Sequence, residues 1–206
     1  MKLVLATRNA AKLDELRRIL EPLLAVEVLG LGDVPPYEEV PESGATFEEN
    51  ALIKAREAAV RTGLPAVADD SGLAVDALNG MPGVLSARWA GSAASDPANL
   101  RLVLEQIGDV PDERRGAAFV CAAVLVTADG AEHVVRGEMA GTLLRAPRGT
   151  NGFGYDPIFV PDHETRTTAE MSPAEKDAIS HRGKAFRALA PLVATALSAP
   201  PRTSPV

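Results

Sequence analysis

Two adjacent carboxylates follow a short apolar run in residues 65–73. The run 66–68 is typical of a buried strand, and Asp69, Asp70 and Ser71 come directly after it. Because ligands in open α/β sheets bind beyond the carboxyl ends of strands, we expect these three side chains to face a cleft. Neighbouring carboxylates repel each other unless a cation intervenes, and a divalent metal such as Mg²⁺ is a common partner. The alternative interpretation is a polar turn whose side chains bond to the local backbone.

A second polar stretch connects an expected strand, residues 2–6, to an expected helix. Leucines at helical spacing follow the connection: Leu13, Leu16, Leu20 and Leu23. The connection contains Thr7, Asn9 and Lys12, and a hydroxyl, an ammonium and the free N–H groups of a helix start suit an oxyanion. The glycines and the Gly-Lys-Ser/Thr ending of a Walker loop do not occur in it. The alternative is ordinary helix capping by Asn9 beside a solvated Lys12.

Other elements must hold these groups in place. Strands are expected over residues 26–29, 116–127, 131–139 and 157–160, with a hairpin turn at 128–130 and residues 141–144 continuing the meander. A capping box at Thr46–Glu49 predicts a helix that ends near Thr62, and Asp96-Pro97 begins another that stops at Gly108. A further capping box at Ser172 opens a helical region that is interrupted over residues 180–184 and resumes over 185–197.

Three more stretches contain residues that suit a ligand. Glu42 stands ahead of the helix that carries Lys54, and an ordinary loop acid is the alternative for it. Residues 149–157 contain three glycines in six positions, which allow a close backbone approach, and two aromatic side chains that offer stacking faces. A turn between strands is the commoner explanation of such a loop. The pair His181-Arg182 beside a helical break suggests donors directed at a ligand, although a histidine on a helix is usually structural.

The composition excludes several classes of function. A formal net charge of −7 over 206 residues argues against broad nucleic-acid binding. Aromatic residues are 4% of the chain, so we expect a core of mainly Ala, Val and Leu. Cys121 is the one cysteine, which excludes an internal disulfide and a thiolate metal site. We find neither a signal-peptide pattern nor a membrane span and expect a cytoplasmic protein, with one domain over residues 1–198 and a disordered Pro-rich tail over 199–206.

Five separated stretches together resemble the inosine triphosphate pyrophosphatase family: residues 7–12, 42–54, 68–72, 149–156 and 172–182. Three runs look like family signatures in the family's order: Ala68-Asp69-Asp70-Ser71-Gly72-Leu73, Gly152-Phe153-Gly154-Tyr155-Asp156-Pro157 and Ile179-Ser180-His181-Arg182-Gly183. The resemblance extends from Lys2 to about Leu197. It departs slightly at Arg8 and Asn151, where many relatives have smaller residues.

The resemblance implies an α/β fold, with an elongated mixed β-sheet flanked by helices and two lobes on either side of an active-site cleft. It implies Mg²⁺-dependent hydrolysis of non-standard purine nucleoside triphosphates (ITP, dITP and XTP) by attack of water on the α-phosphorus. The products are the nucleoside monophosphate and pyrophosphate, and the reaction cleanses the nucleotide pool. The family also implies a homodimer.

The same resemblance assigns roles to residues. Asp70 would activate the water, and Glu42 and Asp70 would hold Mg²⁺ with Asp69 close by. The triphosphate would be bound by Lys54 and by the first loop: Thr7, Arg8, Asn9, Ala10, Ala11 and Lys12. Ser71 would contact the substrate. The base pocket would comprise Phe153, Gly154, Tyr155, Asp156, Lys176, His181 and Arg182.

These residue types suit the implied chemistry on physical grounds. Triphosphate hydrolysis needs positioning, positive charge and one carboxylate for the water. Donors such as Arg182 match the carbonyl at position 6 of hypoxanthine and would remain unpaired against the amino group of adenine. Two other functions stay open: a hydrolase of modified pyrimidine triphosphates, which a panel of bases would separate, and a non-catalytic nucleotide-binding module, in which Asp70 and Glu42 would have no role.

Overall fold

The computed structural model describes residues 1–38, 40–93 and 95–198. The chain divides into two compact units, each assembled from separated segments. The first contains Met1–Asp70, Ala122–Arg136 and the described part of Ala185–Val206, and the second contains Ser71–Cys121 and Gly137–Lys184. The tail expected over residues 199–206 lies outside the described residues.

The strands form one mixed six-stranded sheet in the order β2-β1-β3-β4-β5-β6. Their bounds are β1 Lys2–Leu5, β2 Glu27–Gly30, β3 Ala66–Val75, β4 Gly116–Val126, β5 Glu132–Leu143 and β6 Phe159–Pro161. Strand β1 pairs in parallel with β2 and β3, whereas β5 pairs antiparallel with β6. The prediction of a mixed sheet flanked by helices is therefore confirmed.

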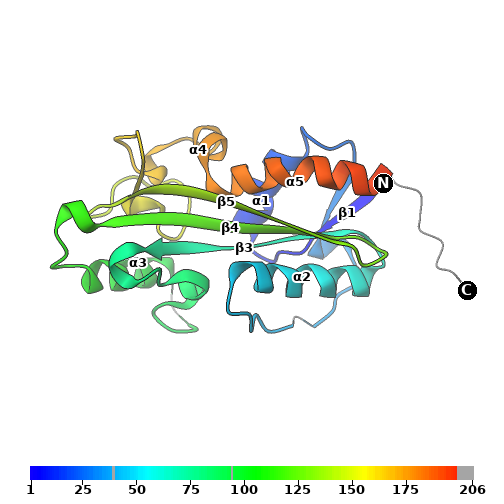
Figure 1. Ribbon diagram of the computed structural model, residues 1–206, viewed down its shortest axis with the longest axis horizontal. Coiled ribbons are helices and arrows are strands. Elements are labelled where there is room, and N and C mark those ends of the chain that lie inside the picture. The colour runs from blue at the N-terminus through cyan, green and yellow to red at the C-terminus, as the bar shows by residue number, and fades with distance from the viewer. Residues whose placement is uncertain (39, 94, 199–206) are drawn as a thin grey trace, which may run out of the picture. The chain divides into compact units, whose positions relative to one another are not determined.

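Five α-helices accompany the sheet in the described residues: α1 Ala10–Leu20, α2 Phe47–Thr62, α3 Asp96–Gln106, α4 Pro173–Ile179 and α5 His181–Ser198. Short 3-10 turns are η1 Leu31–Asp33, η2 Asp76–Leu78, η3 Gly83–Arg88, η4 Asp112–Arg114, η5 Asp156–Ile158 and η6 Thr168–Glu170. Within the first unit, α2 and α5 lie on opposite sides of the strands (Figure 1). In the described residues, no helix has the length and apolar character needed to cross a membrane.

Strand β1 is buried on both faces in the first unit. Leu3, Val4 and Leu5 of β1 are fully buried, as is usual for a parallel strand covered by helices on two sides. The expected apolar face of α1 is partly wrong, because Leu16 and Leu20 are buried but Leu23 is 48% exposed. The helix ends at Leu20, two residues before Pro22, which has no N–H to donate and restricts the residue before it.

The second unit packs around α3, β4 and β5. Its apolar cluster includes Val103 and Ile107 of α3, Phe119 of β4 and Leu143 of β5. Arg115 is buried at the edge of this cluster with 2% exposure. Its guanidinium donates to the carbonyls of Ile107, Leu143 and Leu144 at 2.6, 2.9 and 2.9 Å. This one side chain therefore pairs the carbonyls at the ends of α3 and β5.

Two boundary predictions need correction. The strand expected to end at Ala68 continues as β3 to Val75, so Asp69 and Asp70 lie inside a strand rather than beyond it. Opposite charges make this possible, since lysine ammonium groups lie beside both carboxylates. The helical break expected over residues 180–184 is confined to Ser180, whose Oγ accepts the Gly183 N–H at 2.9 Å and so caps a helix that begins at His181.

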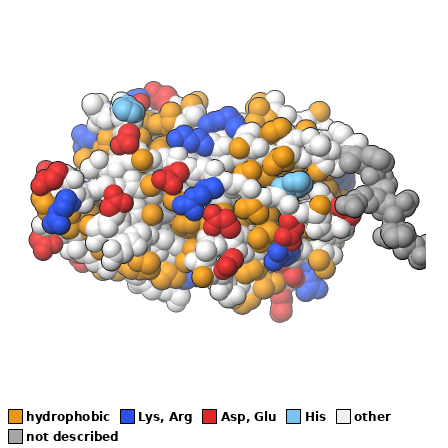
Figure 2. All heavy atoms as spheres, in the orientation of Figure 1, with side chains coloured by type: hydrophobic (Ala, Val, Ile, Leu, Met, Phe, Trp, Pro, Cys, Tyr) orange, Lys and Arg blue, Asp and Glu red, His pale blue; other side chains and the backbone are white. Residues whose placement is uncertain are grey.

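The remaining elements follow the predictions with small shifts. The hairpin turn at 128–130 is confirmed, with the Thr127 N–H donating to the Ala131 carbonyl at 2.9 Å. The expected continuation at 141–144 is part of β5, and the strand expected at 157–160 is shorter because η5 takes up its first residues. Charged side chains of both signs are interspersed over the visible face (Figure 2), in keeping with the moderate net charge.

Candidate active site

The first unit gathers two carboxylates around one ammonium group. Lys54 of α2 places its Nζ 2.9 Å from Oε1 of Glu42 and 3.5 Å from Oδ1 of Asp70. Asn50, one helical turn earlier, donates from Nδ2 to the other Asp70 oxygen at 3.0 Å. The Asn50 Oδ1 accepts the Gly44 N–H at 2.8 Å, so this side chain ties the loop that carries Glu42 to α2. Asp70 is thus oriented from two directions.

A second ion pair lies beside the first. Lys12 of α1 places its Nζ 3.3 Å from Oδ2 of Asp69, whose side chain has no exposed surface. The Lys12 side chain is only 15% exposed, so the alternative of a solvated lysine is wrong. The adjacent carboxylates of β3 are therefore matched with lysines from two helices, which removes much of the repulsion between them.

Burial and charge act against each other in this cluster. Burial raises the pKa of the Asp70 carboxyl above its ordinary value, and the attraction of Lys54 and Lys12 with the Asn50 hydrogen bond offsets only part of that rise. For Lys54, burial lowers the pKa, but attraction to Asp69, Asp70 and Glu42 outweighs it and leaves the pKa above its ordinary value. Lys54 is therefore held as a cation, and Asp70 is a better proton acceptor than an exposed aspartate.

The loop between β1 and α1 is ordered by its own polar side chains. Asn9 is the N-cap of α1, and its Oδ1 accepts the Lys12 N–H at 3.1 Å. The Thr7 Oγ1 accepts the Asn9 N–H at 3.3 Å, and Arg8 donates to the Tyr37 carbonyl at 2.9 Å. The capping alternative is correct for Asn9. Ala10 and Ala11 supply the first N–H groups of the helix, where partial positive charge favours an anion.

The residues expected to hold Mg²⁺ fit that ion in part. Glu42 and Asp70 direct oxygen atoms at the same ammonium group, and two carboxylates completed by substrate oxygens are a usual environment for Mg²⁺. Asp69 faces Lys12 instead. In the part of the chain that the structure describes, no three His, Cys, Asp or Glu side chains form a ready-made metal site. The donor set therefore suits an ion that arrives with phosphate ligands.

The second unit brings together most of the residues expected to bind the base. Arg182 of α5 is 2% exposed and donates from Nη2 to Oγ of Ser71 at 2.7 Å. The half-buried ring of Phe153 has two cations over it, with Lys176 Nζ 5.2 Å and Arg182 Cζ 5.8 Å from its centroid. An aromatic face flanked by donors suits a planar heterocycle with carbonyl groups.

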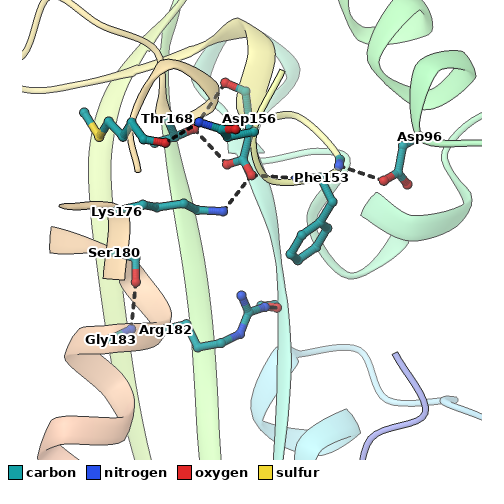
Figure 3. A network of polar contacts seen from close by, with 12 residues as sticks. Asp96, Phe153, Asp156, Thr168, Lys176, Ser180, Arg182 and Gly183 are labelled. Atoms are coloured by element: carbon teal, nitrogen blue, oxygen red, sulfur yellow. Dashed lines mark hydrogen bonds and ion pairs between the residues drawn. The ribbon is translucent and has the colours of Figure 1, made fainter. Parts of the chain in front are cut away.

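Asp156 is the centre of the polar network in this unit (Figure 3). Its Oδ2 accepts the Lys176 ammonium at 2.6 Å and the Phe153 N–H at 2.9 Å. Its Oδ1 accepts the Thr168 hydroxyl at 2.7 Å. At Gly152, a Cβ would overlap Asp156 Oδ2, and the positive φ of 75° is one that glycine adopts freely. The carboxylate therefore orders both the lysine and the glycine-rich turn.

The other expected pocket residues have structural partners too. Tyr155 is buried, and its hydroxyl donates to the Ser86 carbonyl at 2.8 Å. Burial, with a smaller contribution from the charge of Asp96, raises the pKa of the Tyr155 hydroxyl well above its ordinary value. The His181 ring stacks on Phe119, with centroids 5.0 Å apart and an interplanar angle of 15°. Gly154 donates its N–H to Asp96 Oδ2 at 2.7 Å.

Each expected residue lies in one of the two units. The first unit holds Thr7, Arg8, Asn9, Ala10, Ala11, Lys12, Glu42, Lys54, Asp69 and Asp70. The second unit holds Ser71, Phe153, Gly154, Tyr155, Asp156, Lys176, His181 and Arg182. The peptide bond between Asp70 and Ser71 joins the clusters within β3.

Three residues near these clusters had no role assigned from the sequence. The spacing of Asn50 could have indicated its position, since it precedes Lys54 by one turn of an Ala-rich helix and therefore lies on the same helix face. Asp96 looked like an ordinary acid in the first turn of α3, and Thr168 looked like a loop residue. Their bonds to Gly154 and Asp156 depend on the tertiary fold and leave no local pattern.

Comparisons of sequence and of structure both match this chain to members of one protein family. The model of the Ham1 family matches residues 3–192. A dITP/XTP pyrophosphatase from Nocardia farcinica is 63% identical over 195 residues, which cover 94% of this chain and 95% of that protein. The crystal structure of a nucleoside-triphosphatase / dITP/XTP pyrophosphatase from Mycobacterium abscessus matches with a TM-score of 0.76 and 63% identity, over 92% of this chain and 98% of that one. A HAM1 protein from Coxiella burnetii matches with a TM-score of 0.84 and 45% identity, over 95% and 100% of the two chains.

Proposed function

We propose, since this chain belongs to the Ham1 family, that it hydrolyses dITP, ITP and XTP to the nucleoside monophosphate and pyrophosphate. The names of its similar relatives support a hydrolase of this kind. The observation that carries the proposal is the placement of Asp70, a buried carboxylate held by Asn50 and Lys54 with a second lysine on the neighbouring Asp69. A protein that only binds nucleotides has no need of two carboxylates where phosphate is bound.

Asp70 is the proposed proton acceptor. Attack of water on phosphorus requires a group that takes the water proton, and a carboxylate with a raised pKa suits that task better than an exposed one. The Asn50 amide and the Lys54 ammonium fix the direction of both Asp70 oxygens, which limits the positions that the water can take.

The triphosphate is proposed to lie on the cations of the first unit. Lys12 and Lys54 would hold the β- and γ-phosphates, which leave together as pyrophosphate. The free N–H groups of Ala10 and Ala11, with Thr7, Arg8 and Asn9 in the same loop, would add donors at the start of α1. Holding the leaving group here directs the water to the α-phosphorus.

Glu42 and Asp70, with Asp69 close by, would hold Mg²⁺ together with substrate oxygens. When bound, the ion supplies positive charge that stabilises the transferring phosphoryl group. Lys54 lies against both Glu42 and Asp70 and therefore helps to keep these two carboxylates close enough to share one ion.

The second unit is proposed to select the base. Phe153, with Gly154 and Tyr155, would offer a stacking surface, and Arg182, His181 and Lys176 would direct donors at the purine carbonyl. Ser71 would contact the substrate, while Asp156 would act through the lysine and the turn that it orders. Ser71 follows Asp70 directly in β3, so the two clusters are joined within one strand.

We further propose that the protein works in the cytoplasm as a homodimer, with residues 1–198 acting as one catalytic domain. A pool-cleansing enzyme must meet free nucleotides, which supports the location. The dimer rests on the family resemblance, and sedimentation equilibrium of the purified protein would test it.

One assay tests the proposed function. Purified protein is incubated with Mg²⁺ and each of ITP, dITP, XTP, GTP, ATP and a modified pyrimidine triphosphate, and pyrophosphate release is measured. We expect rapid pyrophosphate release from the first three. A preference for the pyrimidine would point to a different hydrolase, and binding without turnover of any nucleotide would reject catalysis.

A further inference from the structure

Two different carboxylates hold the backbone on either side of Phe153. The Phe153 N–H donates to Asp156 Oδ2 at 2.9 Å, and the next N–H in the chain, that of Gly154, donates to Asp96 Oδ2 at 2.7 Å. Figure 3 shows Asp96 reaching this turn from α3, a different element from the one that carries Phe153. Both peptide planes that flank the Phe153 Cα are therefore anchored.

We propose that Asp96 is a positioning residue that sets the direction of the Phe153 ring and thereby the affinity for the base. The inference rests on the proposed function, in which Phe153 stacks on the purine. The two peptide planes determine φ and ψ of Phe153, and these determine where its Cα–Cβ bond points. The Asp156 carboxylate holds the first plane, and Asp96 holds the second together with a longer bond from the Asp156 N–H to the Phe153 carbonyl.

The turn itself supplies little of this rigidity. Gly152 and Gly154 flank Phe153 with φ of 75° and 62°, and glycine reaches many other conformations at similar energy. A Cβ at Gly154 would meet nothing within 4 Å, so this side of the residue is open. Two hydrogen bonds hold the 153–154 peptide plane: the Gly154 N–H donates to Asp96 Oδ2 at 2.7 Å, and the Phe153 carbonyl accepts the Asp156 N–H at the longer distance of 3.3 Å. The shorter, charge-assisted bond to Asp96 is the stronger of the two.

The position of the Phe153 ring matters because two charged side chains make cation–π contacts with it. Lys176 and Arg182 lie over the ring at 5.2 and 5.8 Å from its centroid. A ring that turns away from this position loses its cation–π contacts and presents a tilted face to the base. Loss of the Asp96 bond should therefore weaken substrate binding while the cluster around Asp70, which Asn50 and Lys54 hold rather than Asp96, is unchanged.

Asp96 has a competing structural explanation. It is the first residue of α3, where an acid is favourable near the positive end of the helix dipole. Ser95 is the N-cap of α3, and in the described residues its side chain makes no capping bond. The two explanations predict different results for Asp96→Asn, which removes the charge but retains an oxygen that can accept the Gly154 N–H. A positioning role should survive this change, whereas a favourable charge at the helix start should be lost.

The test compares Asp96→Ala and Asp96→Asn by hydrogen exchange and by steady-state kinetics. The Gly154 amide should exchange at least about 10-fold faster in the Ala variant than in wild type, and the Asn variant should stay near wild type. For ITP, the Ala variant should raise KM about 10-fold with kcat within about twofold, and the Asn variant should restore most of the loss. Asp112→Ala, which removes an exposed acid of the same unit, should change neither measurement.

A double-mutant cycle shows whether the effect passes through the ring. In a Phe153→Leu background, Asp96→Ala should cause little further loss of kcat/KM, because the ring that it positions is gone. Equal losses in both backgrounds would overturn the proposal, and so would unchanged Gly154 exchange, unchanged KM in the Ala variant or an Asn variant as impaired as Ala. Wild-type protein that hydrolyses no nucleoside triphosphate would reject the proposed function, and with it a role in base affinity, even if Gly154 exchange confirms the tether.

Discussion

The Nη2 of Arg182 donates a hydrogen bond of 2.7 Å to the Oγ of Ser71. Ser71 follows Asp70 directly, so the side chain expected to recognise the base is bonded to the neighbour of the side chain expected to activate water. Arg182 is 2% exposed, which gives its guanidinium little alternative contact with solvent. In the proposed function, recognition of the base and placement of the attacking water would therefore be linked through two consecutive residues of β3.

Arg182→Ala should reduce the preference for 6-oxopurines. A buried arginine offers only donors, which match a carbonyl oxygen and are left unpaired against an amino group. One such unpaired donor costs about 1–3 kcal/mol, which corresponds to about 5- to 150-fold in kcat/KM. We expect kcat/KM for ITP and XTP to fall about 10-fold more than kcat/KM for ATP. The measurement is a set of kcat/KM values for ITP, XTP, GTP and ATP.

Phe153→Leu is the matched control for this variant. Stacking on an aromatic face tolerates every base, so all four purines should weaken alike. If Arg182→Ala slows all four nucleotides equally, or if wild type prefers ATP, the assignment of the base pocket is wrong even when pyrophosphate is still released.

Asp70→Asn should abolish turnover without unfolding the protein. Removing a general base costs about 10²–10⁴-fold in rate, and the loss of one ligand to Mg²⁺ adds to this. Asn50 can still bond to the amide oxygen, so the local structure should be retained. The measurement is kcat for ITP alongside circular dichroism. Glu132→Gln, which changes an exposed acid paired with Arg56, serves as the control and should remain active. A folded Asp70→Asn protein with about a tenth of the wild-type kcat would exclude Asp70 as the base.

Hydrolysis in ¹⁸O-labelled water should place the label in the nucleoside monophosphate. Lys12 and Lys54 are proposed to hold the β- and γ-phosphates as the leaving group, which exposes the α-phosphorus to water. Mass spectrometry of the two products identifies the labelled one. Label in the released pyrophosphate would mean that water attacks the β-phosphorus and that the triphosphate lies in the opposite direction.

Glu175→Gln should change how stability depends on pH. The Ser172 N–H, the Ser172 hydroxyl and Arg166 lower the pKa of Glu175 from 4.5 to about 2, the first being the largest cause. A carboxyl with a lowered folded-state pKa stabilises the protein above its unfolded pKa, and that contribution is lost as the pH falls toward about 2. The Tm difference between wild type and Glu175→Gln should therefore be constant at neutral pH and shrink below pH 4.5.

Arg166→Met tests the origin of that effect. The backbone N–H of Ser172 is retained in this variant, so most of the pH dependence should remain. If Arg166→Met removes as much pH dependence as Glu175→Gln does, the surface ion pair rather than the capping box is responsible.

Arg115→Met should destabilise the second unit strongly. The substitution removes the hydrogen bonds from Arg115 to three carbonyl groups, of which the Ile107 carbonyl keeps the Val110 N–H as a partner. A buried polar group that loses its partner costs about 1–3 kcal/mol. We expect the free energy of unfolding to fall by about 3 kcal/mol or more, measured by urea denaturation. Arg145→Met is the comparison, since Arg145 also donates to carbonyls after α3 but is 54% exposed. Its loss should cost less than about 1 kcal/mol, and similar costs for both variants would contradict a special role of burial.

Local signals predicted the elements whose ends are set by local contacts. Helix α2 begins after Thr46, whose Oγ1 accepts the Glu49 N–H, and ends before Gly63, as the capping pattern indicated. Helix α4 begins after Ser172 in the same way. Sequence neighbours make these contacts, so the sequence contains the information needed to locate them.

The predictions from the sequence are wrong or incomplete where contacts between residues far apart in the chain determine the structure. A strand that contains two aspartates looks as if it should end, but Lys12 and Lys54 neutralise them and β3 continues. The glycine-rich loop could be recognised from its composition, whereas its anchors Asp96 and Thr168 could not, because α3 and η6 reach it only in the folded unit. Tertiary contacts of this kind have no periodicity to detect.

The two glycines around Phe153 should differ in evolutionary freedom. At Gly152 any side chain would collide with the Asp156 carboxylate, so a library of random variants should contain no functional replacement there unless Asp156 also changes. At Gly154 the space for a Cβ is open, and only the φ of 62° opposes other residues. Asparagine, which tolerates that conformation, should survive selection at Gly154. If Phe153 stacks on the base as proposed, functional substitutions beside it should arise at Gly154 before they arise at Gly152. Changes in nucleotide preference should then begin at Gly154.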